Sequence, residues 1–299
     1  MIKKGYILAG ALLLIANFVF AQSPSTVKAY ELYTQGEYAL ASKTIDLAIE
    51  EKDGIDDPLV WQLRAIIYYD LFAKIEAKNT LSESRVISLQ STLKSMELDV
   101  DEKYYTQNIL ILDKLSISYY NDAVVSINNV DQSNYDFAEN SFKEYLRIQR
   151  IAHPNEDLSA KEIDFYRAQA TAFGKLYQAD PVANASYFNL TLNSLQKVLV
   201  IDSLNYGANY NLSIYYYNEG VYNIETINSG IPIQDIIIIE KKGIDLFKKA
   251  LPYMLRAHAI RPREETFKGL RNIYRSLNDV AKYDYYSDEL EKFLENKPD

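Results

Sequence analysis

The chain has 299 residues, a net charge of −9 at neutral pH and no cysteine. An acidic surface repels nucleic-acid backbones and anionic lipid, which disfavours both partners, and the absence of cysteine excludes disulfide bonds and a cysteine-linked lipid anchor. Only 10 glycines and 8 prolines are present, which favours long helices over an all-β fold.

The N-terminal segment has the pattern of a secretory signal peptide. Lys3 and Lys4 precede a run from Ile7 to Phe20 that is apolar except for one asparagine. The small residue Ala21 fits the cleavage rule, so we expect cleavage after it and a periplasmic or secreted mature protein. An uncleaved anchor is the alternative, but the run is shorter than the roughly 20 residues that span a membrane. No later segment is long enough to do so.

The segment at residues 28–50 predicts the first pair of helices. One apolar stripe precedes Gly36, which permits a tight turn, and a second stripe follows it. The small residues Ala29 and Ala41 allow the two helices to cross closely. The second stripe consists of Tyr38, Ala41, Ile45 and Ala48. This pattern is typical of a helical hairpin.

The second pair opens at Asp57 and Pro58, an N-cap acceptor followed by the residue that suits the first helical position. The only tryptophan of the chain, Trp61, lies in its first helix. The return helix, expected at about residues 84–98, is rich in serine and threonine. We therefore expect it to be a degenerate, more polar copy.

The remaining sequence predicts four more pairs in chain order. The third begins near Asp101 and ends at His153, and the second helix of the fourth opens at Asp180. An insertion at roughly residues 223–243 separates the two helices of the fifth pair. A polar, charged helix at about residues 283–293 closes the sixth pair and is suited to capping an open end.

The recurring pattern resembles the tetratricopeptide repeat (TPR), which combines small residues, a tyrosine, a glycine turn and an A-x3-F half. In the fifth pair the resemblance rests on Leu212, Ser213, Tyr216, Gly220 and Tyr222, followed by Ala250, Met254, Ala257 and Pro262. It covers nearly all of residues 22–299. It implies an all-α fold, a right-handed α-solenoid of about six hairpins in one domain, of an irregular exported bacterial type.

No pattern in the sequence predicts catalysis. The two histidines, His153 and His258, each lack a second metal ligand at helical spacing. His153 suits a helix end, where an imidazole meets the negative pole of the helix dipole. The sequence has no nucleophile elbow, phosphate-binding loop or dinucleotide fingerprint. We therefore expect a protein that is not an enzyme and needs neither metal nor cofactor.

Tyrosine is unusually frequent, at 26 residues against 11 phenylalanines. In a TPR array the first helices of successive hairpins line a concave groove, and the residue after the motif tyrosine faces it. Gln178 and Arg275 hold that position in the fourth and sixth pairs. The candidate groove residues are Tyr30, Tyr33, Tyr69, Tyr120, Tyr210 and Tyr217.

A row of tyrosines offers flat apolar area, a hydroxyl handle and a small entropy cost, which suits a bound peptide or glycan. The resemblance implies a non-catalytic scaffold of the cell envelope that binds a protein partner. A glycan or small-ligand receptor that uses the same groove is the alternative. The tyrosines also have a purely structural interpretation, because in TPR proteins such rings pack adjacent hairpins together.

The isoleucine-rich part of the insertion has two interpretations. It is either the buried start of a long helix that runs to Ile260, with Asp235 as its N-cap, or an exposed apolar flap that captures another protein. We favour the buried helix because one helical stripe continues through the segment. That stripe consists of Ile236, Ile239, Gly243, Phe247 and Ala250.

Overall fold

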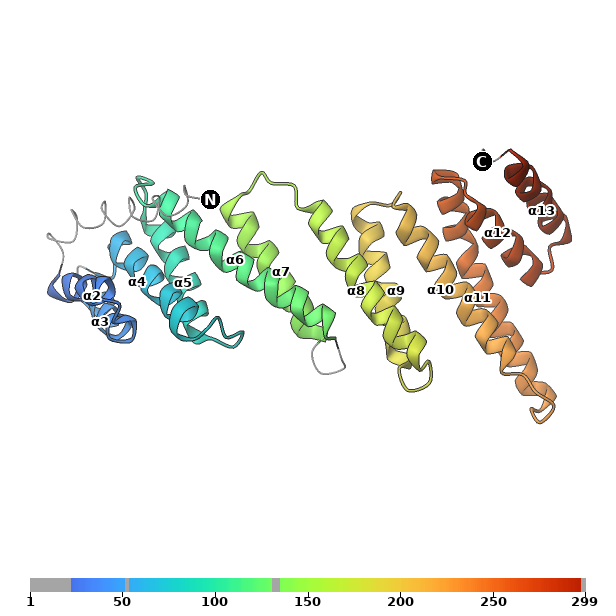
Figure 1. Cartoon of the computed structure of the whole chain (residues 1–299), viewed down its shortest axis with the longest axis horizontal. Helices are drawn as coiled ribbons and strands as arrows, with labels where there is room; N and C mark the ends of the chain where they lie inside the picture. The colour runs from blue at the N-terminus through green and yellow to red at the C-terminus, as the bar shows by residue number, and fades with distance from the viewer. Residues whose placement is uncertain (1–22, 52–53, 131–134, 297–299) are drawn as a thin grey trace. The chain divides into compact units, whose positions relative to one another are not determined.

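The computed structural model describes residues 23–51, 54–130 and 135–296. The expected signal peptide at residues 1–21 lies outside the described residues. The described part is all-α, and its α-helices pack as sequential pairs, which confirms the expected fold class (Figure 1). The chain divides into two compact units, the N-terminal unit up to Glu156 and the C-terminal unit from Asp157 onward.

Each unit contains three helical hairpins. In the N-terminal unit these are α2 (Pro24–Thr34) with α3 (Tyr38–Glu50), α4 (Pro58–Asp70) with α5 (Glu83–Leu98), and α6 (Tyr105–Asn128) with α7 (Tyr135–Ala152). A short π-helix, η1 (Leu71–Ile75), follows α4. In the C-terminal unit they are α8 (Ser159–Ala179) with α9 (Ala185–Ile201), α10 (Tyr206–Glu225) with α11 (Ile233–Ile260), and α12 (Glu264–Ser276) with α13 (Val280–Glu295).

The turn of the first hairpin and the start of the second hairpin form as the sequence predicts. Gly36 has a φ of +82°, in the left-handed region that favours glycine. Ala29 and Ala41 are fully buried where the helices of the first hairpin pack. Asp57 caps α4 by accepting a hydrogen bond of 2.8 Å from the Leu59 backbone N–H, and Pro58 is the first helical residue.

The serine-rich helix α5 is polar, as predicted, but its polar side chains are buried. Ser88 donates to the backbone oxygen of Ala65 at 2.8 Å, and Ser95 donates to that of Pro58 at 2.9 Å. Both side chains are fully buried, and both acceptors belong to α4. Small hydroxyl side chains that bond to the opposite backbone let α4 and α5 pack closely while both hydroxyls stay paired.

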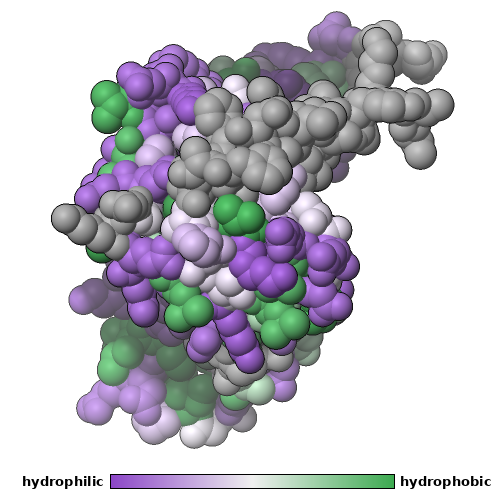
Figure 2. All heavy atoms as spheres, turned by 90° about the vertical axis from the view of Figure 1, so that its left-hand side faces the viewer, coloured by the Kyte–Doolittle hydropathy of each residue, from purple (hydrophilic) through white to green (hydrophobic). Residues whose placement is uncertain are grey.

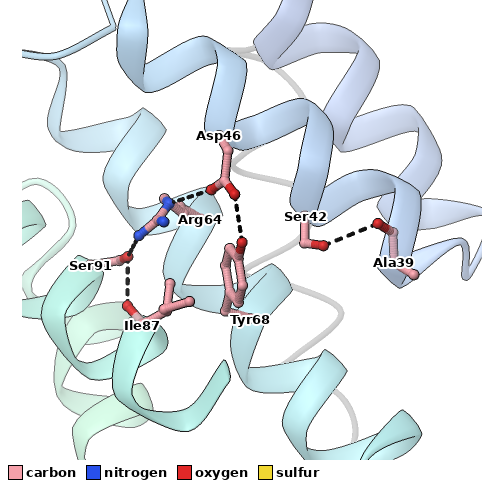
Figure 3. A network of polar contacts seen from close by, with 7 residues as sticks. All are labelled: Ala39, Ser42, Asp46, Arg64, Tyr68, Ile87 and Ser91. Atoms are coloured by element: carbon pink, nitrogen blue, oxygen red, sulfur yellow. Dashed lines mark hydrogen bonds and ion pairs between the residues drawn. The ribbon is translucent and has the colours of Figure 1, made fainter. Parts of the chain in front are cut away.

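A polar network joins three consecutive helices of the N-terminal unit (Figure 3). Asp46 of α3 accepts hydrogen bonds from Arg64 Nε at 2.8 Å and from the Tyr68 hydroxyl at 2.6 Å, and both donors lie on α4. Arg64 Nη1 also donates to the Ser91 hydroxyl of α5 at 2.8 Å. Burial, assisted by the hydrogen bond to Asp46, raises the pKa of Tyr68 to about 12. Its hydroxyl is therefore a donor at neutral pH.

The surface around the first hairpin carries its apolar side chains in separate groups among hydrophilic ones (Figure 2). On α3, for example, Leu40 and Leu47 are exposed. Scattered surface hydrophobics are normal in soluble proteins and need no partner.

The isoleucine-rich insertion is helical, but its start is not buried. Helix α11 begins at Ile233 and runs without interruption to Ile260. Asp235 lies in its first turn and is not its N-cap, which is Pro232. Ile233, Ile237 and Ile238 are 69%, 58% and 65% exposed. The predicted long helix is therefore confirmed. Its predicted stripe is buried at Gly243, Phe247 and Ala250, whereas Ile236 and Ile239 at the start are only partly buried.

Helices α10 and α11 approach each other closely through two glycines. A Cβ atom on Gly220 would lie 2.6 Å from Phe247 Cε1 and 3.2 Å from the backbone oxygen of Gly243. This contact holds the middle of α11 on α10. Among the described residues, none of the helices combines the length and the apolar character required to cross a membrane.

Candidate functional site

A cleft lies between α8 and α10, the first helices of two consecutive hairpins in the C-terminal unit. Its volume is about 540 Å³, and a smaller pocket of about 190 Å³ shares Gln178 and Tyr215 with it. The cleft is lined mainly by Arg167, Thr171 and Lys175 of α8 and by Asn211 and Tyr215 of α10. The smaller pocket adds Tyr177, Pro181, Asn218, Glu219 and Tyr222.

The lining residues recur at helical spacing on each side. On α8 the lining side chains follow one face from Arg167 to Gln178, and on α10 they follow one face from Asn211 to Tyr222. Residues separated by three, four, seven or eight positions share a face of an α-helix. The cleft is therefore a continuous strip between two facing helices.

Tyr215 reaches across the cleft because α8 has a glycine opposite it. A Cβ atom on Gly174 would lie 1.8 Å from the Tyr215 hydroxyl oxygen, so no larger residue fits beside the ring in this position. The ring is partly buried, and this burial raises the pKa of Tyr215 above its ordinary value. The hydroxyl is therefore protonated at neutral pH and can donate a hydrogen bond to a ligand.

The acid in the smaller pocket is already paired. The Tyr177 hydroxyl of α8 donates a hydrogen bond to the Glu219 carboxylate of α10. Asn223 Nδ2 donates to the same carboxylate at 3.2 Å. Burial, followed by the effect of Glu219, raises the pKa of Tyr177 well above its ordinary value. These bonds fix Glu219 and join α8 to α10 at one end of the cleft.

The basic groups of the larger cleft are available to a ligand. Arg167 forms only a long contact of 3.6 Å with Asp164, and both side chains are mostly exposed. Lys175 forms no ion pair within the described residues. An anionic ligand can therefore meet a cation at two positions of the cleft, and Lys175 lies beside the Gly174–Tyr215 contact.

Two of the predicted groove tyrosines pack in the first hairpin. Tyr33 is only 8% exposed, and its hydroxyl donates to Asp70 Oδ2 at 2.8 Å. Tyr30 is partly buried and packs against the hydrophobic cluster of α2, α3 and α4 to which Tyr33 belongs. The expectation that Tyr33 lines an open groove is wrong, because its ring lies in the core and a ligand cannot reach it.

The other two predicted tyrosines of the N-terminal unit are partly buried. Tyr69 contacts Phe72 with a distance of 6.3 Å between ring centroids. Tyr120 is 37% exposed, and its ring packs 5.1 Å from that of Tyr145. Neither tyrosine is among the residues that line the α8–α10 cleft.

The two predicted tyrosines of the C-terminal unit do not line the cleft. Tyr217 packs on Phe247 of α11 at 5.3 Å between centroids, and Tyr210 stacks on Tyr206 at 6.0 Å. The cleft instead uses Tyr215, two residues before Tyr217 and about 200° away around the helix. The helical spacing of Asn211, Tyr215, Asn218 and Tyr222 is the sequence signal that identifies this face.

The histidines occupy structural positions. His153 follows the end of α7, as the sequence predicts, and its Nε2 lies 2.7 Å from Asp113 Oδ1. His258 Nδ1 lies 3.0 Å from the Thr266 hydroxyl, and burial lowers the pKa of His258. Within the described ranges, no three His, Asp or Glu side chains are grouped so as to hold a metal ion.

No protein-family model matches the chain, and no curated protein matches it in sequence. Among solved structures, it is similar to a monomeric mutant of IFIT1 with Gppp-AAAA, at 15% identity and a TM-score of 0.32. A second IFIT1 structure, with m7Gppp-AAAA, matches at 16% identity and the same TM-score. Both matches cover 93% of this chain and 70% of IFIT1. The helices themselves, in sequential pairs, define the fold as all-α.

Proposed function

We propose that the protein is a non-catalytic binding protein with TPR-like hairpins that receives an extended peptide segment of a protein partner in the α8–α10 cleft. The observation that carries this proposal is the strip of tyrosine, amide and basic side chains between two facing helices. The α8–α10 cleft differs from the groove of six tyrosines that the sequence predicts. The proposed role is that of a scaffold or adaptor in the cell envelope.

The dimensions of the cleft suit a peptide. From Arg167 to Gln178 the lining follows α8 for 11 residue steps, or roughly 16 Å at about 1.5 Å per residue. An extended chain advances about 3.3 Å per residue, so about five residues fit along this strip. The amides of Asn211 and Asn218 can bond to a peptide backbone, and Tyr215 and Tyr222 offer ring surface to its side chains.

The basic side chains of the cleft suggest that the bound peptide is acidic. Arg167 and Lys175 would receive a carboxylate of the ligand, because neither is held in a close ion pair within the described residues. A glycan or small polar ligand is the second candidate, since tyrosine rings and amide groups also suit sugar hydroxyls. The two candidates differ in their use of Lys175, because a neutral glycan gains little from a cation.

The cleft can be tested with labelled acidic hexapeptides that contain one aromatic residue, measured by fluorescence anisotropy. We expect Tyr215→Ala and Lys175→Glu each to weaken binding by about tenfold or more, which corresponds to about 1.4 kcal/mol. Helical content should stay close to native in both variants. The melting temperature should stay close to native in Lys175→Glu, because Lys175 is exposed, and should fall modestly in Tyr215→Ala, because the ring packs on Gly174. Binding is therefore measured well below both melting transitions.

Tyr285→Ala is the matched control, because this tyrosine is 53% exposed on α13, outside the cleft. It should leave peptide binding unchanged. Equal affinity of the native chain, Tyr215→Ala and Lys175→Glu for the peptides would contradict the proposal. If Lys175→Glu had no effect on the binding of neutral oligosaccharides that Tyr215→Ala abolished, the glycan alternative would replace it.

We further propose that the chain is exported and cleaved after Ala21, on the strength of the leader pattern. The protein isolated from its native source should then begin at Gln22 and stay in the soluble fraction. Intact mass spectrometry of that material measures the cleavage directly. A mass that includes the leader, together with recovery in membranes, would favour the uncleaved anchor.

A further inference from the structure

Helix α11 carries an apolar stripe that is separate from its contact with α10. Ile233, Ile237 and Ile244 are exposed, and Leu255, 37% exposed, continues the stripe. At 100° per residue these four positions fall within a sector of about 40°. The side chains that pack against α10 and α12, such as Phe247 and Met254, lie outside this sector.

The stripe is uncovered because α11 is much longer than the helix that follows it. Helix α11 has 28 residues and α12 has 13, and the α10–α11 hairpin extends beyond the α12–α13 hairpin (Figure 1). Helix α12 packs on the C-terminal part of α11, where Met254 lies against Gly269. The N-terminal part packs on α10 through Gly243 and Phe247, and its outer side stays open.

Lysines border the stripe at regular intervals. Lys241 and Lys248 lie next to it on the helix surface, and Lys242 and Lys249 lie farther round. Within the described residues none of the four forms an ion pair, although Asp245 lies within one turn of each. Elsewhere, exposed lysines do pair along their helices. Examples are Lys268 with Glu264 and Lys292 with Glu289.

The open part of this face has the period of a helix-pairing seam. Ile237 and Ile244 are spaced by seven residues, as are the bordering Lys241 and Lys248. Leu251, seven residues farther on, is partly buried against the cluster that α11 shares with α12 and ends the open part of the face. Seven-residue spacing of apolar positions is typical of two helices that pack side by side, and charges next to the seam select the partner. The Ile–Lys face, defined as Ile237, Ile244, Lys241 and Lys248, therefore has the form of half of such a pair.

We propose that the Ile–Lys face docks an amphipathic helix of a partner protein whose apolar seam is bordered by Asp and Glu. Acidic flanks would neutralise Lys241 and Lys248, which have no acidic partner in the described residues. An antiparallel second copy of α11 would place these lysine columns opposite each other, and like charges there oppose pairing. The surface lies outside the α8–α10 cleft, so the inference does not depend on the proposed function.

An anionic membrane would meet the same lysines, but the whole chain carries a net charge of −9 and is repelled by such a surface. Helix α11 also contains Asp235, Glu240 and Asp245, which reduce its own positive charge. The isoleucine spacing and the limited net charge together favour a helix with acidic flanks over a lipid surface.

The test uses the full chain and two synthetic peptides of about three heptads. Both have the same Ile and Leu seam, which is bordered by Glu in one peptide and by Lys in the other. We expect the native chain to bind the Glu-bordered peptide at least tenfold more tightly at low salt, by fluorescence anisotropy. The double variant Lys241→Glu, Lys248→Glu should invert this preference.

Ile237→Ser should abolish binding of the Glu-bordered peptide without lowering the melting temperature, because Ile237 is exposed. Val280→Ser on α13 removes a similarly exposed apolar side chain and should change nothing. Equal binding of the two peptides by the native chain would overturn the proposal. The proposal would also be overturned if the native chain bound neither peptide but associated with itself, or sedimented with phosphatidylserine vesicles, and Ile237→Ser removed that behaviour.

Discussion

Replacing Arg85 by alanine should destabilise the N-terminal unit by about 3–5 kcal/mol. Arg85 is 4% exposed on α5, and its Nη1 lies 2.5 Å from Asp122 Oδ2 of α6. Its Nη2 donates to the backbone oxygen of Thr80 at 2.6 Å, and its guanidinium lies 3.9 Å from the centre of the Tyr119 ring. The variant would leave the carboxylate of Asp122 largely buried and without its cation.

Urea unfolding of the native chain and the variant measures this loss. Lys94→Ala is the control on the same helix, because Lys94 pairs with Glu97 at the surface and exposed pairs contribute little. The double variant Arg85→Met, Asp122→Leu should recover much of the lost stability, since it removes both charges and keeps apolar volume. Similar small losses for Arg85→Ala and Lys94→Ala would show that the buried pair does not support the fold.

The hairpins could be predicted because their signals are local. The turn at Gly36 requires a positive φ, and the start of α4 at Asp57 and Pro58 depends on groups only two residues apart. Neither signal depends on the rest of the chain. Apolar spacing then determines which face of each helix packs, and the buried pair Ala29 and Ala41 confirms it.

The interior of the second hairpin could not be predicted in the same way. Arg85, Ser88 and Ser95 are polar in the sequence, but all three are buried. Their burial depends on acceptors in other segments, such as the Ala65 carbonyl and the Asp122 carboxylate. The sequence does not show which distant group will satisfy a polar side chain.

The site depends on how neighbouring helices are rotated against each other. A shift of two positions along α10 turns a side chain by about 200°, which is the difference between Tyr217 against Phe247 and Tyr215 in the cleft. Gly174 on α8 makes room for Tyr215, and that contact joins two separate hairpins. The sequence indicates that tyrosines matter, but the rotation that selects one of them arises from packing between helices.

Tyr33→Ala should also cause a large loss, of about 3–5 kcal/mol, because it removes a buried aromatic ring. The ring of Tyr33 packs edge-on against Tyr38 with 5.7 Å between centroids, and its hydroxyl donates to Asp70. Burial, followed by the charge of Asp70, raises the pKa of Tyr33 above its ordinary value, so the hydroxyl stays a donor at neutral pH. Tyr33→Phe should cost only about 0.5–1.5 kcal/mol, because Lys74 still donates to Asp70 at 2.8 Å.

The loss should be local, because hairpins in a sequential array contact mainly their neighbours. Hydrogen exchange of Tyr33→Ala should show lost protection in α2, α3 and α4, with native protection in the C-terminal unit. Tyr120→Ala is the comparison, since its ring is partly exposed on α6 and its truncation should cost clearly less. An unchanged melting temperature for Tyr33→Ala would place its ring at a surface after all, whereas loss of protection throughout both units would contradict the local model of stability.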